Sequence, residues 1–171
     1  MGMTMTEKIL AKHAGRPEVS AGDLLVSQVD LVLANAITGP PAINEFKKIG
    51  KPVFDKNKIA LVPDHFSPCK DIKAATMCKT MRDFARENDI INYFQVGRMG
   101  IEHTHLPDNV TVSPCVNVID PVSPTCTYAP VTPPSIGIVY TAIVAVLASG
   151  PICSNVSASS KGGLTATQTL L

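Results

Sequence analysis

The sequence predicts a mixed α/β fold, and three observations carry that prediction. Short apolar runs rich in Val, Leu and Ile, which are typical of buried strands, occur at 23–34, 58–62 and 90–96. Segments with helix start and stop signals lie between these runs. A chain in which strands alternate with helices is typical of a layered α/β sheet. With 171 residues, the chain is long enough for one domain with a hydrophobic core.

Three segments carry helix signals. Thr4 and Glu7 have the spacing of a capping box before "KILAKHAG". Pro40–Pro41 precede "AINEFKKIG", and proline is favoured in the first turn of a helix. Asp71 is a candidate N-cap for "IKAATMCKTMRDFAREN". The apolar residues expected to share one face of this third helix are Ile72, Ala75, Met77, Met81 and Phe84.

Charge divides the chain into two parts, and we expect the first to be the better packed. Residues 1–107 contain 26 of the 29 charged side chains, whereas 108–171 contain three, together with seven prolines. We expect 108–135 to be irregular and a helix to form near 138–149. The apolar run at 136–150 is shorter than the roughly 20 residues that span a bilayer, so it favours a buried helix or strand over a membrane span.

Composition excludes several classes of function. The net charge of +1 gives no electrostatic reason to expect nucleic acid or an anionic membrane as a partner. The five cysteines are irregularly spaced and include no C-x-x-C, so they indicate structural thiols rather than a disulfide framework or a metal site. The N-terminus lacks the long apolar stretch of a signal peptide. We therefore expect a reduced, cytoplasmic protein.

Two histidine-containing segments follow two of the predicted strands. Asp64–His65 comes directly after 58–62, and His103 follows 90–96 after the loop "GRMG". If these strands are parallel, both histidines lie at the same edge of the sheet and could share one site. Asp64 could orient the imidazole, or the pair could be an ordinary turn. Arg98 could hold a substrate carboxylate, or it could belong to an ordinary loop.

Four stretches together resemble a known family. In order and spacing, "MTMTEKILAKHAG", "VDLVLANAITGPPAI", "LVPDHFSPCKDIKAA" and "VGRMGIEHTHLP" resemble the start of the large subunit of 3-isopropylmalate dehydratases and homoaconitases, within the aconitase superfamily. The resemblance implies an aconitase-like three-layer α/β/α fold, here an incomplete domain. Residues 1–107 would be its family-like portion and 108–171 a degenerate continuation. In "VSPTCTYA", Val122, Pro124 and Ala129 replace the Asp, His and Gly of a family motif.

The resemblance also implies a chemistry. The family's enzymes are hydro-lyases of leucine biosynthesis that isomerise 2- and 3-isopropylmalate, with a separate small subunit completing the site. An iron of their [4Fe–4S] cluster that lacks a cysteine ligand binds the substrate as a Lewis acid. By this resemblance, the catalytic residues are Asp64, His65 and His103. The implied substrate-binding residues are Thr38, Arg98, Ser123 and Thr125.

The sequence also departs from the family. None of its five cysteines matches a cluster ligand, and Ala36 stands where the family usually has Asp. We therefore expect this chain to be a truncated form that binds no cluster, supplies no metal ligand and is inactive alone. A non-catalytic binding or subunit-assembly module, a homoaconitase-type fragment and a membrane-associated protein built on 136–150 stay open as alternatives. Isopropylmalate, homocitrate-type and methylmalate-type substrates all fit these motifs.

Overall fold

The predicted α/β fold is confirmed. The computed structural model describes residues 2–95, 97–109, 115–120, 135–137, 140–158 and 164–168. In this part of the chain, a parallel sheet has the strand order β4-β3-β2-β5-β6. The bounds of its strands are β2 Leu31–Asn35, β3 Ile59–Val62, β4 Asn92–Tyr93, β5 Val118–Asp120 and β6 Ser135–Gly137.

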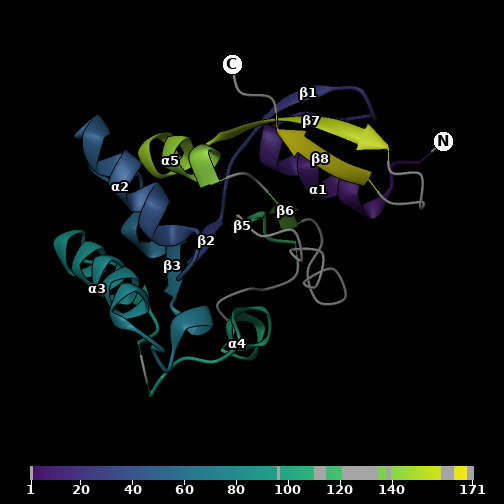
Figure 1. The fold of residues 1–171 in the computed structure, drawn as a ribbon. Helices are drawn as coiled ribbons and strands as arrows, with labels where there is room; N and C mark the ends of the chain where they lie inside the picture. Colours follow the sequence, from purple (N-terminus) through teal and green to yellow (C-terminus); the bar gives the residue numbers. More distant parts are fainter. Residues whose placement is uncertain are drawn as a thin grey trace.

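Helices cover both faces of the parallel sheet. Helices α2, α3 and α5 are grouped on one side of the molecule, at the left of Figure 1. The short helix α4 supplies Leu106 to a separate core cluster with β2, β3 and β5. The helical elements are α1 Met5–Ala14, α2 Gly39–Ile49, α3 Ile72–Glu87, α4 Glu102–Asp108, α5 Tyr140–Ser149, and the 3-10 turns η1 Lys56–Lys58 and η2 Asp64–Phe66.

Alternation along the buried strands explains the layers. Every residue of β2 and β3 is buried, as expected for central parallel strands covered on both faces. One set of alternate side chains packs with α2, α3 and α5: Val32, Ala34, Ile59, Leu61 and Ile119. The other set packs with α4: Leu31, Leu33, Ala60, Val62 and Val118. The sequence therefore builds an α/β/α arrangement, as the family resemblance implied.

A second, antiparallel sheet lies beside the first. Its presence shows that the prediction of one strand at 23–34 is wrong. That run forms two strands, β1 (Leu24–Ser27) and β2, which belong to different sheets. β1 pairs with β7 (Ile152–Ala158), which pairs with β8 (Leu164–Gln168), at the upper right of Figure 1. The break occurs because Asp30 leaves the strand pattern to accept hydrogen bonds from His13 Nε2 and the Asn117 N–H, at 2.6 and 2.9 Å.

Two further expectations are wrong in part. Of the described residues in the strand predicted at 90–96, Asn92–Tyr93 form β4, an edge strand paired with β3, and the neighbouring Ile91 is exposed. Within 108–135, predicted to be irregular, Val118–Asp120 forms β5, which pairs with both β2 and β6. The rest of 110–134 apart from 115–120 lies outside the described residues. The division at residue 107 stays a prediction.

The apolar run on which the membrane alternative rests forms a short helix in the structure. The apolar run at 136–150 contains α5, whose Ala142, Ile143, Val146 and Leu147 are buried in the main core. Among the described residues, no helix is long and apolar enough to cross a bilayer. The helix expected near 138–149 is confirmed at Tyr140–Ser149.

The predicted helix ends are confirmed, and they show how local sequence sets local structure. Thr4 and Glu7 form the reciprocal capping box of α1, with Thr4 N–H donating to Glu7 Oε2 at 2.6 Å. Gly15 ends α1 in the left-handed region at φ 64°. The expected face of α3 is wrong at Ile72 and Ala75, which are exposed. Its buried residues are Ala74, Met81, Phe84 and Ala85.

Replacing Asp71 with alanine is expected to lower the free energy of unfolding by about 1 kcal/mol. The Asp71 carboxylate accepts a hydrogen bond from the Ala74 N–H at 2.7 Å, and the loss leaves a helix N–H without its cap. Urea unfolding measures the change. Lys73→Ala, at an exposed position in the same first turn, is the control and should stay within about 0.5 kcal/mol of the parent. Equal losses in both variants would show that the cap contributes nothing.

Candidate functional site

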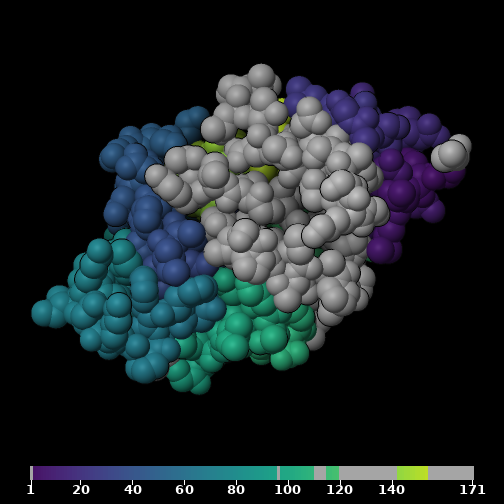
Figure 2. All heavy atoms as spheres, turned by 45° about the vertical axis from the view of Figure 1, so that its right-hand side comes forward, coloured from purple at the N-terminus to yellow at the C-terminus, as the bar shows by residue number. Residues whose placement is uncertain are grey.

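The candidate site lies at the carboxyl edge of the parallel sheet. β2 ends at Asn35, and β3 ends at Val62, directly before Pro63 and the 3-10 turn η2 that holds Asp64 and His65. β3 and β4 are parallel, and α4 begins at Glu102 beyond the loop that follows β4. Figure 2 shows the surface of α3 (teal) adjoining that of the 97–109 segment (green). The topology therefore brings the two histidine segments to one edge.

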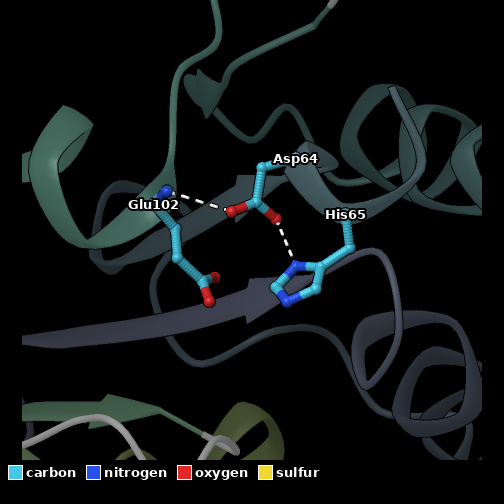
Figure 3. A group of neighbouring side chains, drawn as sticks. All are labelled: Asp64, His65 and Glu102. Carbon is cyan, nitrogen blue, oxygen red and sulfur yellow. Dashed lines mark hydrogen bonds and ion pairs between the residues drawn. The ribbon is translucent and has the colours of Figure 1, made fainter. Parts of the chain in front are cut away.

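Asp64 connects these two segments. Its Oδ1 lies 2.6 Å from His65 Nδ1, and its Oδ2 accepts a hydrogen bond of 3.0 Å from the Glu102 N–H at the start of α4 (Figure 3). Because a carboxylate only accepts, Nδ1 of His65 carries a proton. The neutral imidazole then has its lone pair on Nε2. The His65 side chain is 38% exposed and that of Asp64 10%, so a mostly buried carboxylate orients an accessible ring.

Glu102 is a buried carboxyl group beside this pair. Its side chain points to the same side of Asp64 as the His65 ring (Figure 3). Asn35 Nδ2 donates to Glu102 Oε1 at 3.2 Å. Burial, and then the nearby charge of Asp64, raise the pKa of Glu102 from 4.5 to about 7. The site therefore contains an acid that exchanges its proton near neutral pH, which is the range useful for acid–base chemistry.

His103 faces the same carboxyl group. Its Nε2 lies 3.5 Å from Glu102 Oε1, and its side chain is mostly buried. Burial lowers the pKa of His103 below its usual value of 6.5, against the opposing effect of the Asp64 charge. Burial therefore favours the neutral imidazole of His103. The neighbouring carboxyl group of Glu102 holds its proton until the pH is near 7.

Asn35 joins Thr38 to the group. The side-chain oxygen Oδ1 of Asn35 accepts hydrogen bonds from the Thr38 hydroxyl and from the backbone N–H groups of Ile37 and Thr38, at 2.9–3.0 Å. Its amide donates to Glu102. A fully buried asparagine therefore fixes the loop after β2 against α4. Ala36, where the family usually has Asp, is buried in this loop and offers no polar group.

The sequence-predicted residues divide into three groups. Asp64, His65 and His103 come together around Glu102, and Thr38 reaches the group through Asn35. Arg98 is exposed, and no hydrogen bond or ion pair among the described residues joins its guanidinium to the group. Ser123 and Thr125 lie outside the described residues.

Sequence reasoning missed Asn35 and Glu102. Asn35 is the polar residue that ends an otherwise apolar strand, and Glu102 lies between the glycine loop and His103. Asn35 carries a signal, because a polar group at the end of a buried strand must find a partner, whereas Glu102 begins a helix and carries no such signal. Nothing in the sequence, however, shows that these two side chains bond to each other across 67 residues.

The described residues do not fit an iron–sulfur cluster. A [4Fe–4S] cluster with one open iron needs three cysteine thiolates. The described cysteines that contact each other are Cys69 and Cys78, which are two thiols and not three. Asp64, His65 and Glu102 bring three possible metal-ligand atoms within 4.8 Å of one another. Because Asp64 uses both oxygens on His65 and Glu102, the group is better described as a hydrogen-bonded acid–base constellation.

Comparisons with known proteins agree with the four sequence stretches. No family model matches the chain. It is 52% identical over 166 residues to the 3-isopropylmalate dehydratase large subunit of Lachnoclostridium phytofermentans, covering 96% of this chain and 39% of that protein. It is 54% identical over 151 residues to that of Acetivibrio thermocellus, covering 88% and 36%.

A relative with a different name is equally similar. The 2,3-dimethylmalate dehydratase large subunit of Eubacterium barkeri is 51% identical over 168 residues, covering 98% of this chain and 40% of that protein. The similarity therefore extends well beyond residue 107. The chain spans about two fifths of the length of these relatives. This chain is thus a homologue, along almost its whole length, of part of the large subunit of 3-isopropylmalate dehydratase.

Proposed function

We propose that this chain carries the acid–base part of a hydro-lyase site for a small hydroxy-dicarboxylate and does not complete the reaction alone. One observation carries the proposal: Asp64 binds the accessible ring of His65 and the start of α4, so the buried carboxyl group of Glu102 lies beside that ring. The names of the relatives, which are dehydratases of substituted malates, give the reaction class.

The chemistry of dehydration explains the need for such a group. Loss of water removes a hydroxyl from one carbon and a proton from its neighbour, so one protein group must give a proton and another must accept one. His65, with Nε2 free of the Asp64 contact and partly exposed, is the group that we assign to meet the substrate. Asp64 positions its ring. Glu102 and His103 form the buried proton-exchanging pair behind it.

The substrate class is a malate with one or more alkyl substituents. Relatives named for isopropylmalate and for dimethylmalate are 52% and 51% identical to this chain, so overall identity does not separate the two substrates. We also propose Thr38, Arg98, Ser123 and Thr125 as substrate contacts, by their family positions. The partner would be a dehydratase small subunit, since the relatives are named large subunits. A cytoplasmic location fits the free thiols of the described cysteines.

Catalysis by the chain alone can be tested directly. We expect the purified chain, treated anaerobically with iron and sulfide and mixed with a dehydratase small subunit, to retain no stoichiometric iron. We expect no turnover of 2-isopropylmalate or 2,3-dimethylmalate. The reason is that, among the described cysteines, two contacting thiols do not supply three cluster ligands. Turnover above that of the small subunit alone would overturn the proposal of inactivity.

Substrate binding gives a second test that does not depend on turnover. Replacing Asp64 with asparagine should weaken binding of a branched 2-hydroxydicarboxylate by about 1.5–3 kcal/mol, the range for a lost hydrogen bond to a charged group. That loss corresponds to roughly 10- to 150-fold in Kd. Titration calorimetry with 2-isopropylmalate measures it. Asp108→Asn, at an exposed position on α4, is the control and should bind like the parent. A parent chain that binds neither substituted malate would contradict the assigned site.

A further inference from the structure

A pair of cysteine thiols lies next to the candidate site but is not used by it. Cys69 Sγ and Cys78 Sγ are 3.9 Å apart, although the two residues are nine positions apart in the sequence. Cys69 lies in the segment between η2 and α3, and Cys78 lies in the second turn of α3. The irregular spacing of the cysteines along the sequence gave no sign that these two thiols lie close together.

The two thiols differ in their surroundings. Cys69 is exposed, so it can meet a small solute from solvent. Cys78 is partly buried and packs against the main core together with Phe66. Burial and the contact with Cys69 raise the pKa of the Cys78 thiol, while Ser67 and Arg82 oppose that shift. An exposed thiol backed by a protected one is the arrangement of a pair in which one sulfur is oxidised and the other resolves it.

The surroundings favour a sulfur–sulfur bond over a metal site. Among the described residues, no third His, Cys, Asp or Glu ligand atom joins the two sulfurs in a cluster. A structural zinc ion takes four ligands, and two thiolates supply half of them. A disulfide needs only the two sulfurs, which must approach from 3.9 Å to about 2.05 Å. Cys69 lies outside any helix or strand, so the approach does not require a helix or strand to break.

We propose that Cys69 and Cys78 form a reversible disulfide when the chain meets hydrogen peroxide. The Cys69 thiolate attacks one peroxide oxygen, the O–O bond breaks, and the products are a sulfenic acid and hydroxide, which is protonated to water. The Cys78 thiolate then attacks the Cys69 sulfur and expels hydroxide, which is protonated to a second water. Two thiols are oxidised by two electrons and one hydrogen peroxide is reduced to two waters. The inference does not depend on the proposed function.

The position of the pair gives the bond a local consequence. The disulfide would close a loop from Cys69 to Cys78 and link the segment after η2 covalently to α3. Phe66, the last residue of η2, already contacts this helix, because its carbonyl oxygen lies 3.9 Å from Cys78 Sγ. Cys78 belongs to the same chain and lies next to Cys69, so its effective concentration at the oxidised Cys69 sulfur is high. A free thiol in solution would therefore compete poorly with Cys78.

The test treats the purified chain with hydrogen peroxide and counts free thiols before and after. Of five thiols, we expect two to be lost and to return with dithiothreitol. Peptide mapping should recover the 69–78 crosslink. Cys115→Ser removes another exposed thiol, and this variant should behave like the parent.

Two variants make the pairing specific. In Cys69→Ser and Cys78→Ser the crosslink and the paired thiol loss should disappear. In Cys78→Ser the unresolved sulfenic acid of Cys69 should be trapped by dimedone. Circular dichroism verifies that each variant folds. If Cys69→Ser does not fold, Cys69→Ala is used in its place. A parent chain whose Cys69 goes to sulfinic acid without a crosslink, or whose Cys69 pairs as readily with Cys115, would overturn the proposal.

Discussion

Replacing Glu102 with glutamine is expected to stabilise the chain at pH 8 by about 3 kcal/mol and to leave its stability unchanged near pH 4. Folding raises the pKa of Glu102 from 4.5 to about 7. Between these values the folded chain keeps a proton that the unfolded chain has released. The contribution of Glu102 to stability therefore falls as the pH rises from 4.5 to 7 and is constant above. Glutamine is neutral throughout, so its difference from the parent follows this curve.

The neighbours of Glu102 determine how the experiment is read. Asn35 can still donate to the glutamine side-chain oxygen, so the variant keeps the bond to β2. The pKa of His103 is lowered by burial, so its contribution weakens as the pH falls below 6.5 and opposes that of Glu102. His103 is present in both proteins, so the part of its contribution that comes from burial cancels when parent and variant are compared.

Urea unfolding at several pH values between 4 and 8 measures that difference. Glu18→Gln, at an exposed position, is the matched control and should stay within about 0.5 kcal/mol of the parent at every pH. If Glu102→Gln destabilises the chain equally at pH 4 and pH 8, the carboxyl group is not held with a raised pKa. The acid–base role proposed for it would then fail.

Replacing Phe84 with alanine is expected to lower the free energy of unfolding by about 3–5 kcal/mol, the usual range for a buried phenylalanine. Phe84 is 1% exposed on α3, and its ring packs edge-to-face on that of Phe46 from α2, with centroids 5.7 Å apart. Removing the ring loses the contact between the two helices and leaves a cavity. Thermal or urea unfolding of the purified variant measures the loss.

A second variant on the same helix controls for helix propensity. Ile72 is 86% exposed, so Ile72→Ala should change the free energy of unfolding by no more than about 0.5 kcal/mol. Phe84→Leu keeps an apolar side chain of substantial size and should lose less than Phe84→Ala. A Phe84→Ala variant that loses no more than Ile72→Ala would show that α2 and α3 do not pack through this ring.

Features set by neighbouring residues could be predicted from the sequence. The capping box of α1, the prolines at the start of α2 and the Asp71 cap of α3 depend on residues a few positions apart, and all are confirmed. The strand predicted at 23–34 was wrong because its division depends on His13 and Asn117, which reach Asp30 from distant segments. Apolar content alone does not distinguish one long strand from two short ones.

The site divides in the same way. Asp64–His65 and His103 could be chosen from their positions after two predicted strands, and the parallel pairing of β3 and β4 brings them to one edge. The close thiols of Cys69 and Cys78 could not be chosen, since the turn η2 and the start of α3 set their separation. Nor could the exposure of Arg98 be predicted, because it depends on the conformation of the loop before α4.

By itself, then, the sequence determined the α/β class, the helix ends and the resemblance to the dehydratase large subunit, because each depends on local patterns or on their order along the chain. The tertiary structure decided which side chains meet. It buried Glu102 between Asp64, Asn35 and His103, and burial beside a like charge changes an ordinary carboxyl group into one that titrates near pH 7. Desolvation and charge proximity are properties of three-dimensional neighbours, and no spacing in the sequence encodes them.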